Sequence, residues 1–441
     1  MKGLLRKSGD RALLEEDGQR IHFVFSSALN REVLSDSERF HSRFFALRGP
    51  RISSQRRITS GLLSQNGELY RTSRRRLAEV FSKRSIPGYH EEAGAILMSY
   101  LQQLSVGKSI NIVAEMESLM LTMTSRLLFG INDPQLIPLL GKVMGEWTRL
   151  NHEAGMGALV SNSRFLDSYP QLLEKAQSVE ELIRQLFAEH GCSGQEFRTI
   201  LDVLADWNSE SNAADLLDDE QIGHATLVFA AAHMTTANTL AWTLFLLAQH
   251  PHLLTKLNRE IGENVAGAVP TPEEIGRLTL LDAVVRESMR VLPASSYSQR
   301  IATGSSELGG LKVRSGETVI FSQFITHHRA DLYENPDAFL PSRWAEVSPS
   351  PFEYLPYGTG PRACIGAGLA DLEMRMILAA FLRRFAPQLQ ADQVVNGRVV
   401  ATMLGPEGAI FVDLLPAGAS VQQVPIKGNL LELVDLAAAP A

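Results

Sequence analysis

The sequence predicts a mainly α-helical protein with a small β-rich part. From residue 91 to residue 247, apolar side chains recur with a helical period between short glycine-containing breaks. Strand-like patterns lie outside this stretch, at residues 11–25, near 301–320 and at 394–414. The motifs described below extend from residue 67 to residue 366 and depend on one another. We therefore expect one domain over residues 1–415, followed by a C-terminal tail at 416–441.

In chain order, residues 11–25 predict a β-hairpin with its turn at Asp17-Gly18. A short helix is expected at 27–39, a loop at 44–63 and a helix at 66–82. The helical stretch should break at Gly107, 130–134, 155–157 and 191–194. A helix of about 30 residues, roughly 45 Å long, should follow, capped by Asp218 and Gln221.

The remaining elements are a helix at 278–292 and short strands at 307–319. A long amphipathic helix should follow Cys364 directly. Residues 394–414 alternate like a pair of hairpin strands, with Met403-Leu404-Gly405 expected at the tip.

The composition is that of an ordinary globular protein, with 45% hydrophobic and 21% charged residues. A net charge of −7 argues against a nucleic-acid partner. Residues 1–18 lack the apolar core of a membrane anchor, and the uncharged run at 222–248 has polar residues at its middle. With only two cysteines, Cys192 in a polar stretch and Cys364, we expect a cytoplasmic protein in a reducing compartment.

Cys364 lies in a loop rich in glycine and proline, directly before the predicted helix. The unpaired N–H groups at a helix N-terminus favour an anion, so we expect a thiolate with a lowered pKa, helped by Arg362 two residues upstream. Such a thiolate is a soft metal ligand. Gly358, Gly360 and Gly366 remove side chains nearby, which would let a large flat group such as heme approach the backbone.

The run Tyr357-x-x-Gly360-x-Arg362-x-Cys364-x-Gly366 resembles the heme-binding loop of the cytochrome P450 family. The resemblance implies the cytochrome P450 fold and a heme b cofactor whose iron is bound by Cys364. It also implies that Tyr357, Gly358, Arg362 and Gly366 contact this cofactor. The family usually has Phe where this chain has Tyr357, whose hydroxyl needs a partner.

Other segments extend the resemblance over roughly residues 10 to 415. Gly67, Tyr70 and Arg74 follow the family's Gly-x-x-Trp/His-x-x-x-Arg spacing, which implies that Arg74 and, less firmly, Tyr70 bind a heme propionate. Arg300 stands where the family places a second propionate ligand. The exposed pair Arg71 and Arg75 would help an acidic electron donor to dock.

Residues 231–236 resemble the family's oxygen-binding segment. Ala231, Ala232 and Thr235 would lie on the distal side of the heme, with the Thr235 hydroxyl bonding bound oxygen. The family has an acid where this chain has Met234, and a thioether cannot relay protons. Protons would then arrive through Thr235 and water, or the oxidant would be peroxide; alternatively, Met234 simply packs against a neighbouring helix.

The helix at 278–292 contains Glu287 and Arg290 at i, i+3, and Arg343 lies in a segment resembling the family's Pro-x-Arg-Phe/Trp motif. The resemblance implies a buried Glu–Arg–Arg cluster that supports the heme loop. Its role would be structural.

The function implied by the resemblance is a monooxygenase that inserts one oxygen atom from molecular oxygen into a small organic substrate. The sequence contains no flavin or iron–sulfur motif, so electrons should come from a ferredoxin with its reductase or from a flavodoxin-type donor. Small polar residues at 294–298 suggest a polar, secondary-metabolite-like substrate. Two alternatives stay open: a peroxide-dependent or redox-neutral heme-thiolate enzyme, and a non-catalytic heme sensor.

Overall fold

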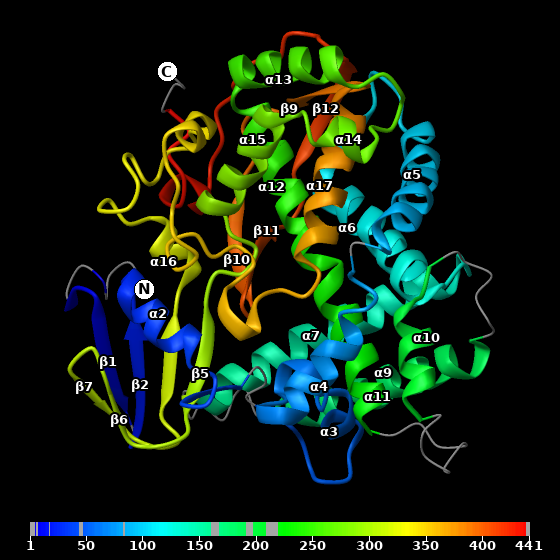
Figure 1. The fold of residues 1–441 in the computed structure, drawn as a ribbon. Helices are drawn as coiled ribbons and strands as arrows, with labels where there is room; N and C mark the ends of the chain where they lie inside the picture. The colour runs from blue at the N-terminus through cyan, green and yellow to red at the C-terminus, as the bar shows by residue number, and fades with distance from the viewer. Residues whose placement is uncertain are drawn as a thin grey trace.

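The protein folds into a helical body with small sheets, as a computed structural model of residues 5, 8–16, 18–43, 47–82, 84–159, 167–190, 197–208 and 219–437 describes it (Figure 1). The predicted mainly α fold with a small β-rich part is confirmed. Three residues on which expectations above depend lie outside the described residues: Asp17, Cys192 and Asp218.

The helices are α2 (Ser27–Ser35), α3 (Ser54–Ile58), α4 (Gly67–Leu77), α5 (Ile86–Gln102), α6 (Ile112–Met123), α7 (Leu136–Leu159), α9 (Tyr169–Glu189), α10 (Ile200–Ala205), α11 (Asp219–Ala232), α12 (Met234–Ala248), α13 (Pro251–Asn264), α14 (Pro272–Ile275), α15 (Thr279–Val291), α16 (Gln323–His327) and α17 (Ala367–Leu382). Within these described segments, none is both long and apolar enough to cross a membrane.

The largest sheet joins the N-terminal hairpin to strands from much later in the chain. Its order is β1 (Arg11–Glu16), β2 (Gln19–Val24), β8 (Thr318–Phe321), β5 (Ser298–Ala302) and β3 (Phe40–Ser42), and only β2 and β8 run parallel. The predicted hairpin is confirmed, with Arg11 opposite Val24 and Glu16 opposite Gln19.

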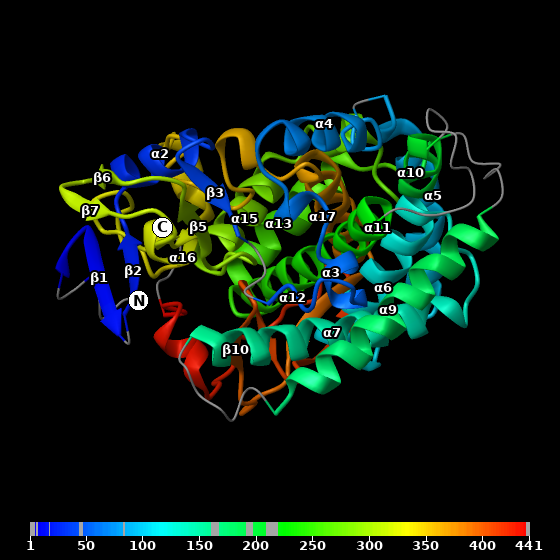
Figure 2. The ribbon, with the colours of Figure 1, turned by 90° about the horizontal axis from the view of Figure 1, so that it is seen from below.

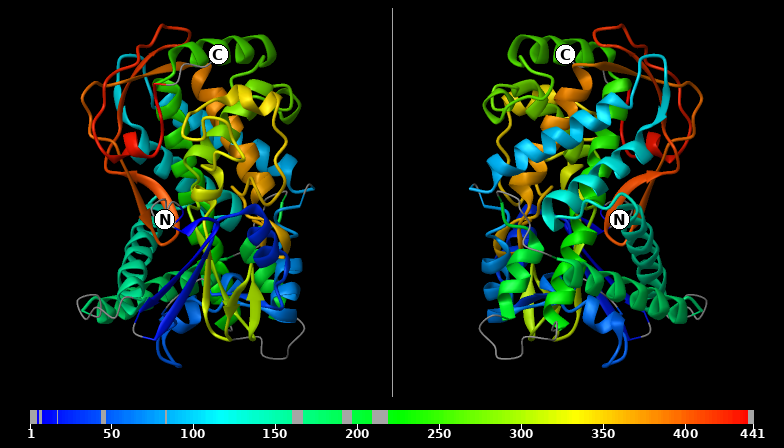
Figure 3. Two further views of the ribbon diagram at one scale, coloured as in Figure 1. Left: turned by 90° about the vertical axis from the view of Figure 1, so that its left-hand side faces the viewer. Right: turned by 90° about the vertical axis from the view of Figure 1, so that its right-hand side faces the viewer.

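The remaining strands of the described segments form three smaller sheets. They are β4 (Ser109–Asn111), β12 (Phe411–Pro416) and β9 (Phe385–Leu389); β10 (Asn396–Val400) with β11 (Met403–Glu407); and β6 (Ser306–Leu308) with β7 (Leu311–Val313). Figure 3 shows β9 to β12 in orange beside the red C-terminal segment, in the half of the molecule away from the large sheet.

The turn between β10 and β11 lies at Ala401 and Thr402, so the expectation of a tip at residues 403–405 was wrong. Ala401 has a positive φ of 57°, which lets the chain reverse there. Met403 and Gly405 consequently belong to strand β11, and the backbone of Met403 forms a bridge with Ser295.

Several predicted helix boundaries also differ. The helices expected at 27–39 and 66–82 end at Ser35 and Leu77, and the loop expected at 44–63 contains α3. The glycines at 155–157 do not break α7, which continues to Leu159 and packs against α9 along one side of the helical body (Figure 2). Conversely, the expected helix of about 30 residues is divided at His233 into α11 and α12. Every residue of α12 from Thr236 to Ala248 is buried, so this helix forms the centre of the core.

The C-terminal segment after β12 packs against the rest of the protein. Val421, Leu430 and Val434 are buried in the main hydrophobic core, and the backbone of Asp435 forms a bridge with Ala338. The division into a domain at 1–415 and a tail at 416–441 stays a prediction.

Candidate functional site

Cys364 is held at the start of α17 by backbone hydrogen bonds. Its N–H donates to the carbonyl of Tyr357 at 2.8 Å, and the N–H of Ala363 donates to the carbonyl of Gly360 at 3.1 Å. Gly366 is the N-cap of α17, so the sulfur lies just ahead of the helix N-terminus, as the sequence suggested. The thiol is free and its side chain is exposed.

Two glycines of this loop have different reasons to be glycine. Gly358 has a φ of +63°, and a Cβ added there would meet nothing within 4 Å. Gly360 has a φ of +71°, and its Cβ would lie 2.4 Å from the carbonyl oxygen of Leu34 at the end of α2. Gly358 therefore leaves open space beside the loop, whereas Gly360 allows the loop to approach α2.

The expected lowering of the Cys364 pKa is not what the structure favours. The side chain is accessible at its surface, yet it lies deep enough among protein atoms that burial raises the pKa of the thiol. The backbone N–H of Gly366 and the charge of Arg74 act in the predicted direction, but they are weaker. The predicted lowering of this pKa followed from the helix N-terminus and a nearby cation, and it did not include the cost of burying the thiolate.

Tyr357 has a buried hydroxyl without a hydrogen-bond partner in the described part of the chain. Its ring packs against the main core, and burial raises the pKa of the phenol. The partner that this hydroxyl was expected to need is not supplied by the residues around it.

Three arginines from separate elements gather near Cys364. Arg74 comes from α4, Arg300 from β5, and Arg362 from the loop before the cysteine. Among the residues that the structure describes, none of them has a carboxylate within ion-pair distance. Their recorded hydrogen bonds go to neutral oxygens. Arg74 donates to Tyr70 Oη at 3.2 Å and Arg300 to the Gln299 carbonyl at 2.9 Å, while Arg362 donates to Asn66 Oδ1 at 2.6 Å and to the Gln65 carbonyl.

The electrostatics of this arginine cluster show that the positive charges are unmatched. Burial and, next, the charge of Arg362 lower the pKa of Arg300 to about 10. Burial also lowers the pKa of Arg362, and the charge of Arg74 adds to that effect. A buried cation without a counter-ion is costly, so this cluster is suited to anionic groups brought by a ligand.

Tyr70 contacts two arginines of the cluster, and its expected bond to a heme propionate stays a prediction. Its hydroxyl donates to the carbonyl of Pro361 at 2.8 Å and accepts from Arg74, and its ring lies under the Arg362 guanidinium at 3.6 Å. Tyr70 therefore holds two of the arginines in place. The sequence signal for this role was the i, i+4 spacing of Tyr70 and Arg74.

The segment expected to contact oxygen lies at the break between α11 and α12. Ala231 is exposed and Ala232 is half-buried. The Thr235 hydroxyl donates to the Ala231 carbonyl at 3.0 Å, and a ring nitrogen of His233, Nδ1, bonds the Phe229 carbonyl at 2.9 Å. Both are bonds from a side chain to the carbonyl four residues earlier, a pattern that Thr226, Thr239 and Thr243 repeat elsewhere in these two helices.

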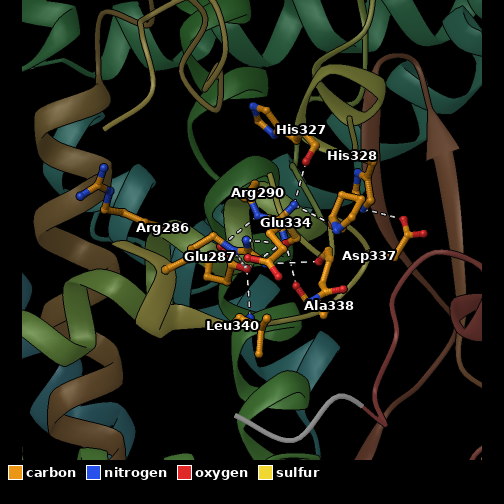
Figure 4. Close-up of polar contacts among 12 residues, drawn as sticks. Arg286, Glu287, Arg290, His327, His328, Glu334, Asp337, Ala338 and Leu340 are labelled. Atoms are coloured by element: carbon orange, nitrogen blue, oxygen red, sulfur yellow. Dashed lines mark hydrogen bonds and ion pairs between the residues drawn. The ribbon is translucent and has the colours of Figure 1, made fainter. Parts of the chain in front are cut away.

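Glu287, Arg290 and Arg343 come together in a buried cluster. Figure 4 shows Glu287 beside Arg290, with Ala338 and Leu340 next to them. Glu287 accepts two hydrogen bonds from Arg290 and one from Arg343, each at 2.9 Å. The indole N–H of Trp344 donates to the same carboxylate at 3.0 Å. The remaining donors of the two arginines are directed at backbone carbonyls, namely those of His327, Glu334, Asn335, Pro336 and Ala338.

The Glu287 cluster connects to the cysteine loop through His327. Its carbonyl accepts from Arg290, and its ring nitrogen Nε2 accepts from the N–H of Leu355 at 2.7 Å. Burial holds the pKa of His327 well below its usual range, which keeps the ring neutral and able to accept. Sequence reasoning did not identify His327, because no spacing rule links it to a loop 28 residues away.

The polar residues proposed for a substrate wall are largely engaged within the protein. The hydroxyls of Ser296 and Tyr297 donate to the carbonyls of Thr402 and Ala401, at 3.0 and 2.8 Å. The amide of Gln323 donates to the hydroxyls of Ser295 and Ser298. These groups fix the β10–β11 turn, so they give no support for a polar substrate.

A comparison with family models decides the classification. The model described as Cytochrome P450 matches residues 4–405. The chain belongs to the cytochrome P450 family. Members of this family bind heme iron through a cysteine thiolate.

Curated relatives agree with this membership. The chain is 26% identical over 389 residues to cyclooctat-9-en-7-ol 5-monooxygenase of Streptomyces melanosporofaciens, covering 86% of this chain and 82% of that protein. It is 32% identical over 273 residues to steroid 17-alpha-hydroxylase/17,20 lyase of Felis catus, covering 55% and 53%. It is 27% identical over 263 residues to mitochondrial sterol 26-hydroxylase of Oryctolagus cuniculus, covering 57% and 49%. The chain thus spans about half the length of the last two relatives.

Proposed function

We propose that this chain is a heme-thiolate monooxygenase that inserts one oxygen atom from molecular oxygen into a small organic substrate. Heme b, when bound through the Cys364 sulfur, would supply the oxygen chemistry. The overall reaction consumes one O₂, two electrons and two protons, and forms the hydroxylated product and water.

The observation that carries this proposal is the meeting of one accessible thiol with the arginine cluster. A thiolate at a helix N-terminus is a soft metal ligand, and Cys364 occupies that position. The two propionates of heme would bring negative charge to Arg74, Arg300 and Arg362, which have no carboxylate of their own among the described residues. Guanidinium groups suit carboxylates because they donate in a planar fork.

The other residues of the site would position the reactants. Tyr70 holds Arg74 and Arg362, and the Glu287 cluster supports the loop through His327. On the oxygen side, exposed Ala231 leaves room beside the helix, and the Thr235 hydroxyl can exchange its bond to the Ala231 carbonyl for one to a reactant.

The direct test is spectroscopic. Reduced protein with carbon monoxide should show the red-shifted Soret band of a thiolate heme. Cys364→His should abolish this band, and Cys192→Ser, which changes the other cysteine in the sequence, should leave it unchanged. Heme content should be measured in parallel, so that a lost ligand is distinguished from lost heme. A band that survives Cys364→His would rule out the assignment.

The electrons would come from a ferredoxin with its reductase or from a flavodoxin-type donor. Of the two arginines proposed for docking, Arg71 already pairs with Glu38 and Glu68, at 3.0 and 2.9 Å. Arg75 is exposed, and no ion pair is recorded for it within the described residues, which makes it the better candidate. Arg75→Glu should slow reduction by the donor at low salt without changing substrate binding. An unchanged reduction rate would remove this surface from the proposal.

The substrate class rests on the relatives alone. The relative aligned over most of its length is named for the oxidation of cyclooctat-9-en-7-ol, and two others are named for steroids or sterols. We therefore infer a largely apolar, polycyclic substrate with a few polar groups. A panel of such compounds, monitored by the spin-state change of the heme, would test this, and binding only of small polar compounds would contradict it.

Met234 favours a second candidate, a peroxide-dependent enzyme, because no acid stands at that position. Turnover with hydrogen peroxide should then equal or exceed turnover with oxygen and an electron donor. Efficient product formation with the donor system would exclude this candidate.

A further inference from the structure

A cavity of about 520 Å³ lies against the break between α11 and α12. Its wall is formed by α6, the first turns of α7 and the connection between them, and His233 and Met234 line it from the break. Asn132, Pro134 and Pro138 are exposed at its rim, whereas His233 is only 5% exposed. The cavity therefore extends from the surface of the protein to the irregular turn beside Thr235.

Three ionisable side chains line this cavity: Glu117 and Arg126 from the α6 side and His233 from the break. Arg126 is paired with Glu92. Glu117 has no recorded ion pair or hydrogen bond within the described residues, and burial raises the pKa of its carboxyl group. Glu117 can thus hold a proton nearer to neutral pH than an ordinary glutamate.

His233 is oriented by its neighbours. Its Nδ1 bonds the carbonyl of Phe229, so this nitrogen carries the proton and the neutral ring leaves Nε2 as an acceptor. Burial lowers the pKa of His233, which keeps the ring neutral. No hydrogen bond to Nε2 is recorded among the described residues, and the ring lines the cavity.

We propose that Glu117 supplies protons to the oxygen side of the site, through water in this cavity that is ordered by His233. This inference rests on the proposed monooxygenase function and explains how it can operate with Met234 in place of an acid. Glu117 releases a proton to water at the break and regains one from solvent at the rim, so each turnover draws two protons through it. Neither Glu117 nor His233 touches the reacting atoms: Glu117 acts through the water in the cavity, and His233 positions that water.

The geometry supports this route over one along α11 or α12. A continuous helix blocks water with its side chains and backbone, but the chain is irregular at His233. The hydroxyl of Thr235 already bonds the Ala231 carbonyl across this break. A cavity of this size can hold several water molecules, and the polar side chains in its mostly apolar lining, among them Glu117, Arg126 and His233, give them partners.

The first experiment compares Glu117→Gln with the wild-type holoenzyme. A positioned acid typically contributes about 10²–10⁴-fold, so we expect oxygen activation to slow by about 10²-fold, with less product per reductant consumed and a larger solvent isotope effect. Glu117→Asp should retain much of the rate. Glu115→Gln, on the same helix but outside the cavity lining, should behave as wild type. The decisive rescue is Glu117→Gln combined with Met234→Glu, which should restore coupling by placing an acid on the opposite wall.

The second experiment needs no turnover. The carboxyl group of Glu117 should be followed by ¹³C NMR in the resting protein, with Glu117→Gln used to assign its signal. We expect a titration midpoint above that of exposed glutamates, and a change of this midpoint in His233→Phe. An ordinary midpoint that His233→Phe does not move would overturn the inference.

The outcomes separate this inference from the function on which it rests. A normal thiolate Soret band with full coupling in Glu117→Gln would refute the proton route and leave the monooxygenase proposal standing. Absence of that band in the wild type would refute the function itself. Failure of the Met234→Glu rescue, with the Glu117→Gln defect present, would show that Glu117 serves only to hold the fold.

Discussion

Two groups of arginines in this protein are built from the same residue type and differ in one respect. Arg290 and Arg343 surround the carboxylate of Glu287, and their other donors meet backbone carbonyls. The arginine cluster of Arg74, Arg300 and Arg362 has no carboxylate among the described residues. The first group is complete within the chain and serves the fold. The second has no anion among the described residues, which is why we propose it as the site for the heme propionates.

Burial sharpens this contrast. Glu287 and Arg290 are fully buried, yet their charges are matched by two or more partners each. Arg300 lies deep in the protein and its pKa is lowered to about 10, because burial and a neighbouring cation both oppose its charge. The number and charge of the partners of each arginine therefore distinguish the two groups.

The largest effect on stability should come from removing the carboxylate that Arg290 and Arg343 share. Glu287→Gln leaves Arg290 and Arg343 buried without their anion, so we expect the free energy of unfolding to fall by about 3–5 kcal/mol. Urea denaturation of the holoenzyme measures this. The matched control is Glu68→Gln, which removes an exposed ion pair with Arg71 and should leave the free energy of unfolding nearly unchanged. Equal losses in the two variants would mean that the buried cluster is not the stabilising one.

A buried carboxylate without a cation gives the second test. Burial raises the pKa of Glu373 on α17 to about 8, and no ion pair is recorded for it among the described residues. The folded state then binds more protons than the unfolded state between about pH 4.5 and pH 8, so this residue makes the protein less stable as pH rises through that window. Glu373→Gln should match the wild type near pH 4 and exceed it by ~3 kcal/mol at pH 7. Thermal unfolding across this range would measure the difference, and parallel curves would contradict the assignment.

The smallest free-energy effect should come from changing the arginine cluster of Arg74, Arg300 and Arg362. Arg300→Met removes one guanidinium from the arginine cluster. Because a hydrogen bond to a charged group contributes about 1.5–3 kcal/mol, the affinity of the protein for heme should fall roughly tenfold to a hundredfold. The heme-free protein should be as stable as the wild type or more stable, because a buried unmatched cation is gone. Heme transfer to apomyoglobin measures the affinity, and Arg300→Lys, which keeps the charge, should retain part of it. Equal destabilisation of the heme-free and heme-bound forms would show that Arg300 is structural.

The sequence could predict features that depend on local order. The hairpin at 11–25, the helix after Cys364 and the spacing of Glu287 and Arg290 all follow from nearby residues. The helix break at His233 could not be predicted, because the apolar period continues through it and no glycine or proline stands there. The same holds for residues 155–157, where packing of α7 on α9 outweighs the low helix propensity of glycine.

Features that depend on distant residues were missed or misjudged. The raised pKa of Cys364 reflects burial, which a linear motif does not report. Glu117 lies on α6, far in sequence from the segment it faces across the cavity. The tip of the β10–β11 hairpin was placed wrongly because Ala401, a residue with no turn preference, adopts the positive φ.

The sheet pairings impose an order of events on a chain made from its N-terminus. Strand β2 pairs with β8, β3 with β5, and β4 with β12. All three partners lie in the last third of the chain, so the earlier strands keep an unpaired edge until the ribosome reaches that part of the protein. Cys364 emerges before β12 closes its sheet. The helical segments that are made first therefore keep apolar faces exposed until these later strands have been made. This topology is consequently slow to fold and depends on protection from aggregation during synthesis.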